Sequence, residues 1–533
     1  MASRVADPAV GERSIGPVRR TLVLLAVAAA VAVPIAAVPA ADAAPVLVLG
    51  ADGHVRTRED PYLPPAAPLP APAPVDAVPR ARAAAAGPSV PAELRRLQAA
   101  GTLDPATAAG YHDAYVAARD TLRRLHGYRR TQLAAVLGQV RAAAAGGRFI
   151  PSRLPALFLT LQRNRAWWAA APIPAPGRRM TFQGSRIVWQ HYPGQGLQIQ
   201  WLGTFGKANA LWRSGDHDPD LRRLLDEALG LATQRAGGIA FEYQFTFDGG
   251  RPPWVSGLAQ GTALSALSRA AVRLSAPAYF DAARSALGIF RTPPPQGVRV
   301  DTPAGAHYLQ YSYAPSQRIV NGFTQALNGL HDFAALANDD EGRALFASGE
   351  AELRTELPAF DTGAWSLYSR AATGGGGMES DLGYHELLRD FLRGLCDRLT
   401  ADARRAASVG GTEASPAPDP APYCQTATRF TDDLRTPPVL AIAPQRLRQK
   451  GSGAIRFTVD KVSWVTITIR RGSTVVLQRT ARLGRGRHRI GFRPAKAGPH
   501  TITLRAVDLA GNAATATGAL SVAPAAAKRR RAP

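Results

Sequence analysis

The chain has 533 residues, and its 64 Lys and Arg against 40 Asp and Glu give a formal net charge of +24 at pH 7. This length is enough for two or three domains. Two cysteines without clustered histidines exclude the common zinc-binding patterns. The chain shows no basic segment interleaved with aromatic residues and no helix-turn-helix signal, so the charge does not indicate nucleic-acid binding. An acidic polymer as partner is one interpretation of the charge, and the arginine bias of a GC-rich genome is the other.

The first 43 residues have the pattern of a signal peptide. Arginines, the last of them Arg19 and Arg20, precede an apolar run from Leu22 to Val38, and Ala41 and Ala43 supply a small-x-small cleavage site. An uncleaved anchor helix is the alternative interpretation. The sequence therefore predicts an exported protein, either secreted or held at the cell surface.

Composition then divides the remainder of the chain. Residues 44–91 are rich in Pro and Ala and are predicted to be an extended linker without a core. Residues 92–147 have helical spacing and are predicted to form a helical hairpin. A second linker is expected at 402–435, and a basic, disordered tail is expected at 524–533. In an exported chain a disulfide between Cys396 and Cys424 is allowed, and two unpaired thiols are the alternative.

The central region, 148–401, is predicted to be mainly helical. A strand pattern comes first, where Leu197, Ile199 and Trp201 alternate with glutamines. Apolar residues then recur at spacings of three and four, and these define four amphipathic helices around residues 264–274, 280–290, 319–334 and 388–399. Successive helices with short links suggest an α/α toroid or part of one.

The period changes to two in residues 436–523. Short alternating runs such as 455–459, 465–469 and 501–504, separated by turns, predict a β-sandwich. Residues 507–512 look like the last hairpin of an immunoglobulin-like or fibronectin-like module. No catalytic cluster is visible there, so this module is expected to bind or to space.

Four segments of the central region carry a family resemblance. They are GLQIQWLGTFGKANA (196–210), WVSGLAQGTALS (254–265), YSYAPSQRIVNGF (311–323), and the run from Asp361 through Tyr368 to Tyr384 and His385. In this order they resemble the C-terminal helical domain of the D-glucuronyl C5-epimerases, over about residues 180–400. The resemblance implies an α/α fold and an isomerase that inverts carbon 5 of D-glucuronosyl residues in a polysaccharide, without a cofactor or a metal.

The implied chemistry assigns candidate residues. Inversion at carbon 5 needs a base on one face of the sugar and an acid on the other, with donors that hold the carboxylate. A tyrosine is a poor base at its reference pKa of about 10, and nearby arginines would lower that value. The resemblance makes Tyr384, Tyr311 and Tyr368 the proton-transfer candidates. The substrate-binding candidates are Arg370, Asn321, Gln260, Lys207, Asn209, Gln310 and His385, each of which also has an ordinary structural interpretation.

The chain also departs from the family pattern, and the departures leave alternatives open. Gln310 stands where the family has a glutamate, and a neutral amide cannot act as a base. If that glutamate is the base in the family, either the role has moved here, to Tyr313 or Glu379, or the activity has been lost. A polysaccharide lyase would share the first proton abstraction. A hydrolase would need a carboxylate pair, which could come from Glu242, Asp248, Glu379 or Asp381. A non-catalytic glycan-binding protein is the third hypothesis. In each case the expected partner is an acidic polysaccharide, with cell-wall or cell-surface association as a further hypothesis.

Overall fold

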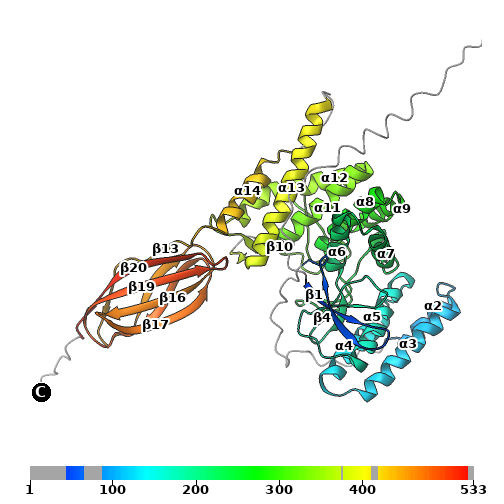
Figure 1. The fold of residues 1–533 in the computed structure, drawn as a ribbon, viewed down its shortest axis with the longest axis horizontal. Helices are drawn as coiled ribbons and strands as arrows, with labels where there is room; N and C mark the ends of the chain where they lie inside the picture. Colours follow the sequence, from blue (N-terminus) through cyan, green and yellow to red (C-terminus); the bar gives the residue numbers. More distant parts are fainter. Residues whose placement is uncertain (1–43, 65–86, 374–375, 410–417, 526–533) are drawn as a thin grey trace, which may run out of the picture.

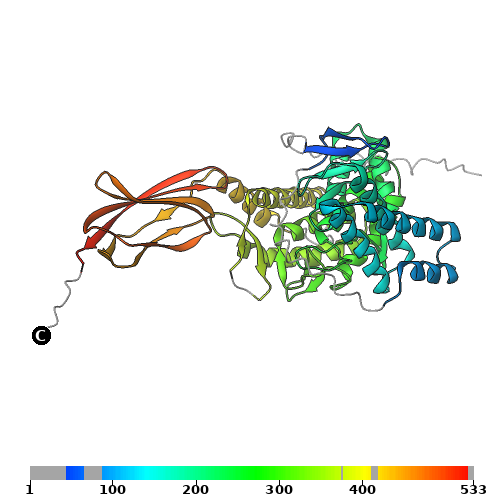
Figure 2. The same cartoon turned by 90° about the horizontal axis from the view of Figure 1, so that it is seen from below.

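The computed structural model describes residues 44–64, 87–373, 376–409 and 418–525. The predicted signal peptide, the Pro-rich run at 65–74 and most of the basic tail lie outside these residues. Figure 1 shows a large helical body and an elongated β module on one side of it, and Figure 2 shows the same arrangement from below. The prediction of a mainly helical protein with a C-terminal β module is therefore confirmed, while closure of the helices into an α/α toroid stays a prediction.

A five-stranded sheet of order β2-β1-β3-β4-β5 lies at one edge of the helical body. Its strands are β1 (Ala44–Leu49), β2 (Val55–Asp60), β3 (Arg179–Phe182), β4 (Trp189–Tyr192) and β5 (Gly196–Ile199). The linker expected at 44–91 is wrong for its first part, because 44–60 form a hairpin whose first strand pairs in parallel with β3. Val46 and Leu49 are buried, so this hairpin has apolar contacts that the Pro-rich composition farther along does not indicate.

Three helices, rather than a hairpin of two, follow the predicted linker. They are α2 (Val90–Ala99), α3 (Pro105–Arg124) and α4 (Gly127–Ala145). Helices α3 and α4 pack against α5 (Leu154–Ala170), and α2 packs against α3 and α4. The additional break lies between α2 and α3. There Gly101 has a φ of +67°, and the Asp104 carboxylate accepts from the Thr107 N–H to start the next helix.

Nine helices among the described residues build the rest of the helical body. They are α6 (Trp201–Ser214), α7 (Asp218–Leu229), α8 (Gly257–Arg273), α9 (Ala278–Ala286), α10 (Gly288–Arg291), α11 (Val320–Ala337), α12 (Asp340–Glu356), α13 (Leu382–Val409) and α14 (Ala421–Asp433). Three of the four predicted amphipathic helices are confirmed, whereas the one predicted at 280–290 is divided into α9 and α10 at Leu287. Trp201 begins α6 and does not continue the strand. At the centre, a Cβ on Gly329 would lie 2.0 Å from the Gly261 carbonyl oxygen, so α8 and α11 approach more closely than side chains would allow.

Short strands and turns connect these helices and carry the site described below. The strands are β6 (Thr233–Arg235), β7 (Gly238–Ala240), β8 (Arg299–Asp301), β9 (Ala306–Tyr308), β10 (Gln317–Ile319), β11 (Leu367–Ala371) and β12 (Met378–Glu379). Two 3-10 turns, Pro151–Arg153 and Leu357–Phe360, precede α5 and β11. Strands β10, β11 and β12 form one antiparallel sheet, which lies next to the start of α13.

The second predicted linker, 402–435, is also largely helical. Helix α13 continues to Val409, and α14 packs back against it, with Tyr423 and Phe430 fully buried. Cys396 on α13 and Cys424 on α14 form a disulfide across 28 residues. The buried face of α14 explains why the Ala- and Pro-rich composition of this region misled the prediction.

The C-terminal module consists of two sheets that share one apolar core. Its strands are β13 (Leu440–Ala441), β14 (Gln445–Arg448), β15 (Gly453–Val459), β16 (Ser463–Arg471), β17 (Thr474–Leu483), β18 (Gly486–Phe492), β19 (Gly498–Asp508) and β20 (Ala513–Ala523). The sheet orders are β13-β15-β18 and β14-β20-β19-β16-β17. Ile455, Phe457, Ile467 and Leu504 contribute to the common core. The predicted strands and the final hairpin are present, and membership of the immunoglobulin-like class stays a prediction.

Glu379 joins the module to the helical body. Its two carboxylate oxygens accept from the Val462 N–H at 2.9 Å and from the Arg485 N–H at 2.7 Å. Lys461 of the module donates to the carbonyl of Asp433 at 2.9 Å, and its ammonium lies 5.5 Å from the centre of the Trp365 ring. These contacts fix the base of the module against β12 and the end of α14.

None of the helices in the described part of the chain combines the length and the apolarity that crossing a lipid bilayer requires.

Candidate functional site

Four tyrosines from three separate parts of the chain lie together. Tyr311 and Tyr313 are in the loop between β9 and β10, Tyr368 is on β11, and Tyr384 is in the first turn of α13. The ring centres of Tyr368 and Tyr384 are 4.5 Å apart, and those of Tyr311 and Tyr313 are 5.3 Å apart. The structure thus brings the three predicted proton-transfer residues together and adds Tyr313; we call these four residues the tyrosine cluster.

Gln310 bridges the tyrosine cluster. Its amide Nε2 donates to the hydroxyl oxygens of Tyr311 at 2.8 Å and of Tyr368 at 3.3 Å. Gly322, in the first turn of α11, leaves room for this amide, because a Cβ there would lie 2.5 Å from Gln310 Oε1. The residue that stands in the place of the family's glutamate is therefore at the centre of the cluster.

An aromatic wall supports the cluster from behind. The Trp254 ring stacks on Tyr243, with centres 4.2 Å apart, and meets Tyr311 and Tyr313 edge-on at 5.7 and 5.4 Å. Phe247 contacts both Trp254 and Tyr311. This wall keeps the tyrosine rings in fixed orientations and removes water from one side of them.

Burial raises the pKa of all four tyrosines above the ordinary value, and neighbouring groups add to it. For Tyr384 the pKa is raised first by burial and then by Tyr368 and the Asp381 carboxylate. For Tyr311 and Tyr368 the pKa is raised first by burial and then by other tyrosines, and for Tyr313 by burial and then by Asp248. The expectation that nearby arginines lower the tyrosine pKa values is wrong for this structure. The hydroxyls are protonated at neutral pH and are set up as donors.

Several buried polar atoms around the cluster have no hydrogen-bond partner among the described residues. They are Gln310 Oε1, the Tyr313 hydroxyl and Asn321 Nδ2. Asn321 is next to Gly322 on α11, and its Oδ1 accepts from the Gly322 N–H at 2.8 Å. Unpartnered buried polar groups are rare in folded proteins, and here they gather beside hydroxyl donors. A polar ligand such as a sugar would satisfy them.

Sequence reasoning missed two residues near the cluster, Arg179 and Tyr192. Arg179 on β3 is buried, and burial lowers its pKa to about 10, while Tyr192 and Tyr243 lie close enough to favour its charge. Within the described residues no carboxylate forms an ion pair with Arg179. Tyr192 on β4 lies near both Arg179 and Tyr384. Arg179 is the first residue of β3 and directly follows Arg178, so no local signal in the sequence distinguishes it.

Other predicted binding residues serve the fold instead. Both polar atoms of Gln260 are bonded to the backbone of Phe241, and Asn209 donates to the carbonyls of Phe205 and Thr262 and accepts from Arg269. Lys207 forms an ion pair with Asp60 at 2.7 Å, which holds the N-terminal hairpin against α6. These contacts occupy the side-chain amides of Gln260 and Asn209 and one of the three donors of the Lys207 ammonium.

His385 and Arg370 make their observed contacts outside the cluster. His385 is fully buried, stacks on Trp365 with ring centres 3.8 Å apart, and uses both ring nitrogens, on Ser366 and on the Phe430 carbonyl. Arg370 lies over the Phe360 ring and lines a different hollow, together with Arg318 and Glu352. The structure therefore does not place either residue where the resemblance implied a role.

Two of the four carboxylates considered for a hydrolase, Glu242 and Glu379, are held in structural contacts. Glu242 is buried between Arg153 and Arg235, at 2.7 Å from each, and its pKa stays low although burial opposes this. Glu379 docks the C-terminal module, and Asp381 accepts from the Tyr384 N–H at 2.8 Å. Glu242 and Glu379 are thus occupied by structural contacts.

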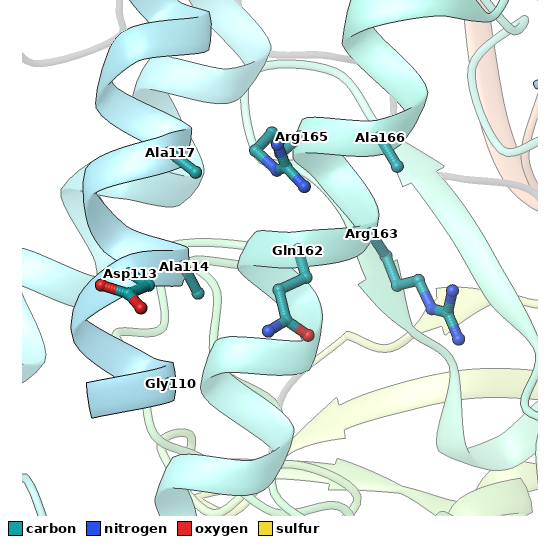
Figure 3. A pocket seen from close by; sticks show the side chains of 8 residues that line it. All are labelled: Gly110, Asp113, Ala114, Ala117, Gln162, Arg163, Arg165 and Ala166. Atoms are coloured by element: carbon teal, nitrogen blue, oxygen red, sulfur yellow. The ribbon is translucent and has the colours of Figure 1, made fainter. Parts of the chain in front are cut away.

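A second hollow, between α3 and α5, is shown in Figure 3. It is lined by small residues such as Ala114 and Ala117, with Gln162 and Arg165 at its side, and none of the tyrosine cluster contributes to it. Within the described residues, no group of three or more His, Cys, Asp or Glu side chains is arranged to hold a metal ion. The tyrosine cluster is the candidate site that the geometry favours.

Comparison with known proteins agrees with this location. Residues 235–403 match the family model described as D-glucuronyl C5-epimerase C-terminus. A D-glucuronyl C5-epimerase of Caenorhabditis elegans is 32% identical over 130 residues, which are 22% of this chain and 21% of that relative. The chain therefore aligns with about a fifth of the length of this curated relative.

Solved structures are more distant. An endo-beta-1,4-glucanase, CMCax, from Acetobacter xylinum is 13% identical, with a TM-score of 0.31 over 42% of this chain and 72% of that chain. An unsaturated glucuronyl hydrolase from Bacillus sp. GL1 is 13% identical, with a TM-score of 0.30 over 44% of this chain and 61% of that chain. At these values neither structure informs the activity. Residues 235–403, which hold the whole tyrosine cluster, are thus the part of the chain that is similar to the C-terminus of the D-glucuronyl C5-epimerases.

Proposed function

We propose that this protein is an isomerase that inverts carbon 5 of D-glucuronosyl residues in an acidic polysaccharide. The observation that carries the proposal is the tyrosine cluster around Gln310, which lies inside the segment that matches the epimerase family. Tyrosines on two sides of a sugar can serve as base and acid in turn, and no redox step is needed. Neither a metal nor a cofactor is part of the proposal.

The proposed steps use the residues of the chain directly. One tyrosine, as phenolate, removes the proton from carbon 5, and the electron pair moves onto the sugar carboxylate. A second tyrosine on the opposite face then gives its phenolic proton to carbon 5, so one proton is removed and one returned. The first tyrosine is left neutral and the second ionised, and proton exchange between hydroxyls or with solvent restores the starting state.

The intermediate places extra negative charge on the carboxylate, which has to be neutralised. Arg179 is a buried cation near Tyr192, which in turn lies near Tyr384, and Arg179 lacks a carboxylate partner within the described residues. We assign it to the substrate carboxylate, in place of Arg370. The unpartnered atoms of Gln310 and Asn321 are assigned to sugar hydroxyls.

A second candidate function is glycan binding without turnover, and Gln310 is the observation that favours it. An amide in the place of a carboxylate removes a natural base, and the raised tyrosine pKa values make a phenolate costly. Under this alternative the cluster would bind the uronate as a set of hydrogen-bond donors. A lyase or a hydrolase remains an outcome of the experiment below.

The experiment is proton NMR of the full chain incubated in heavy water with glucuronate-containing polysaccharides. Deuterium at carbon 5 together with iduronate signals supports the epimerase, and Tyr384→Phe is expected to abolish both. Tyr115→Phe, on α3 outside the matched segment, is the control and is expected to retain activity. A new alkene signal assigns a lyase, shortened chains assign a hydrolase, and binding without exchange assigns the glycan-binding alternative.

We also extend the proposal to architecture and location. The helices are proposed to close into an α/α toroid, since successive amphipathic helices with short connections are typical of that fold. The C-terminal module is proposed to belong to the immunoglobulin-like class. The N-terminal sequence pattern supports export, with function outside the cell or at its surface.

A further inference from the structure

Trp464 is a large apolar side chain on the outside of the C-terminal module. It lies on β16, where Ser463, Val465 and Ile467 are buried, and it is itself 52% exposed. An isolated exposed leucine would need no explanation, but an indole presents a wide, flat surface that folding would normally cover. Trp464 contributes little to the core of the module, so a role in binding accounts better for its position.

The strand register shows which side chains surround Trp464. Directly opposite it are Arg482 on β17 and Val507 on β19. The next row across the sheet contains Thr480, Thr466, Arg505 and Thr515. Directly opposite residues have Cβ atoms about 5 Å apart, so the indole, two guanidinium groups and a row of hydroxyls share one surface. We call this surface the Trp464 face and define it by Trp464, Thr466, Thr480, Arg482, Arg505 and Thr515.

The charge of the module favours an anionic partner. Residues 436–525 contain 15 Lys and Arg but only 2 Asp and Glu, which is a formal charge of +13. Both acidic residues are already engaged, because Asp508 pairs with Lys461 at 3.0 Å and Asp460 accepts from the Val439 N–H at 2.8 Å. The arginines of the Trp464 face therefore have no carboxylate partner in the described part of the module, and their field attracts anions.

We infer that the Trp464 face is a second binding surface for an acidic polysaccharide, separate from the tyrosine cluster. An indole stacks on the apolar C–H face of a pyranose ring, arginine pairs with carboxylates through two parallel hydrogen bonds, and threonine hydroxyls suit sugar hydroxyls. An anionic membrane would be attracted by the same charge. The flat row of threonines beside a single indole fits a chain of sugars better than it fits a lipid bilayer.

The Trp464 face lies close to the strands that carry part of the tyrosine cluster. A role for it in catalysis rests on the proposed function. Trp464 is two residues from Val462, whose N–H is held by Glu379. Glu379 is on β12, and β12 pairs with β11, which carries Tyr368. The Trp464 face thus begins beside the strand pair that holds part of the tyrosine cluster. It would keep a long polymer attached while one residue after another reaches the cluster.

The test compares binding of full-length variants to hyaluronan, a glucuronate-containing polymer, at a fixed ionic strength near 0.15 M. Trp464→Ala and the double variant Arg482→Gln/Arg505→Gln are each expected to weaken binding about tenfold. The matched control is Arg456→Gln/Arg489→Gln, which removes the same charge from a cross-strand pair on the outer side of the other sheet. This control is expected to change the affinity by less than about twofold, and all variants should keep the melting temperature of the parent because the replaced side chains are exposed.

Three results would overturn the inference. They are unchanged affinity of Trp464→Ala, an equal loss in the control pair, and binding to phosphatidylglycerol vesicles but not to hyaluronan. The binding measurement does not need turnover, so it separates this inference from the proposed function. If Tyr384→Phe binds hyaluronan but does not epimerise it, the result supports both the proposed function and this inference. If the parent protein binds hyaluronan through Trp464 but shows no deuterium exchange at carbon 5, the result supports the inference and refutes the epimerase. If the parent epimerises, Trp464→Ala should raise KM for the polymer and not for a short oligosaccharide.

Discussion

Gln310 and Tyr311 are adjacent in the chain and are joined again through their side chains, because the Gln310 amide nitrogen lies 2.8 Å from the Tyr311 hydroxyl oxygen. The same nitrogen reaches Tyr368 at 3.3 Å. A carboxylate at this position would accept hydrogen bonds from both hydroxyls, whereas the amide nitrogen donates hydrogen bonds to them. The side chain at position 310 therefore determines whether the cluster contains a base with a pKa near neutrality or below.

The variant Gln310→Glu tests this directly. We expect it to raise the rate of deuterium exchange at carbon 5 by about tenfold or more, because it adds a positioned general base within reach of two hydroxyls. The measurement is the initial rate of exchange in heavy water. Gln234→Glu, an exposed position on β6, adds the same charge outside the cluster and should leave the rate unchanged. A rate in Gln310→Glu at or below that of the parent would show that the carboxylate is not the missing base.

The raised tyrosine pKa values predict an alkaline pH dependence. A phenolate is the active base in the proposed steps, and burial raises the pKa of Tyr311, Tyr368 and Tyr384 above the ordinary value. The fraction of phenolate at neutral pH is therefore small and grows with pH. We expect kcat/KM to rise about tenfold per pH unit between roughly pH 7 and 9. It should fall again as Arg179 loses its proton, since burial lowers the pKa of that group to about 10. A rate that is constant over this range would point to a carboxylate base instead.

Arg179 should matter for the charge that develops on the substrate. Arg179→Met removes the buried cation and is expected to lower kcat by about a hundredfold, which is typical of losing one group that stabilises transition-state charge. Arg179→Lys keeps the charge and should recover part of the rate. Because Arg179 also donates to the Pro64 carbonyl, melting temperatures have to be compared in parallel. Equal kcat in the Met variant and the parent, with both folded, would exclude the role.

The periodicity of apolar residues was sufficient to predict individual helices and strands, but not which strands pair with each other. The spacing of Leu264 and Leu267, or of Ile467 and Ile469, predicts α8 and β16 because burial on one face imposes a period. Nothing local indicates that β1 pairs with β3, which lies more than 130 residues later. Long-range pairing of this kind depends on the whole fold, so composition alone suggested a linker.

The candidate site was predictable in part, for a related reason. The tyrosines could be found because they lie in the motifs that resemble the family. Gln260 and Asn209 lie in the same motifs, yet their side chains satisfy backbone groups. The sequence shows only that a residue is Gln or Asn. Whether its side chain bonds to the backbone or faces a substrate depends on how the surrounding elements pack. Arg179 lies before these motifs and directly follows Arg178, so the sequence alone does not show which of the two arginines is buried near the cluster.

The disulfide between Cys396 and Cys424 should stabilise the packing of α14 on α13. A cross-link that closes 28 residues restricts the unfolded chain, and this contributes about 3–4 kcal/mol to the free energy of unfolding. We expect Cys396→Ala/Cys424→Ala to lose stability by roughly this amount in denaturant titration, with catalytic rates little changed. Addition of a reductant should lower the stability of the parent and leave the double variant unaffected. A reductant effect on both proteins would rule out the disulfide as its cause.

His385 predicts a loss of stability in mild acid. Its Nε2–H donates to the Phe430 carbonyl at 3.0 Å, and Nδ1 accepts from Ser366, so the neutral ring is the form that fits. Burial lowers the pKa of His385 to about 4, from 6.5 in the unfolded chain. Between these values the unfolded state binds the proton and the folded state does not. The contribution is therefore complete above about pH 6.5 and is lost as the pH falls toward 4, with a total of about 3 kcal/mol.

A His385→Gln variant, whose side chain does not titrate, isolates the contribution of His385 to the pH dependence of stability. His385→Gln will be less stable than the parent at pH 7, but its free energy of unfolding should fall less between pH 7 and 4.5. Asp433 acts in the opposite direction, because burial raises its pKa to about 6 and protonation then favours the folded state as the pH falls. That effect is present in both proteins and cancels in the difference. Parallel pH dependences of the two proteins would show that His385 takes up its proton equally well in the folded and the unfolded chain.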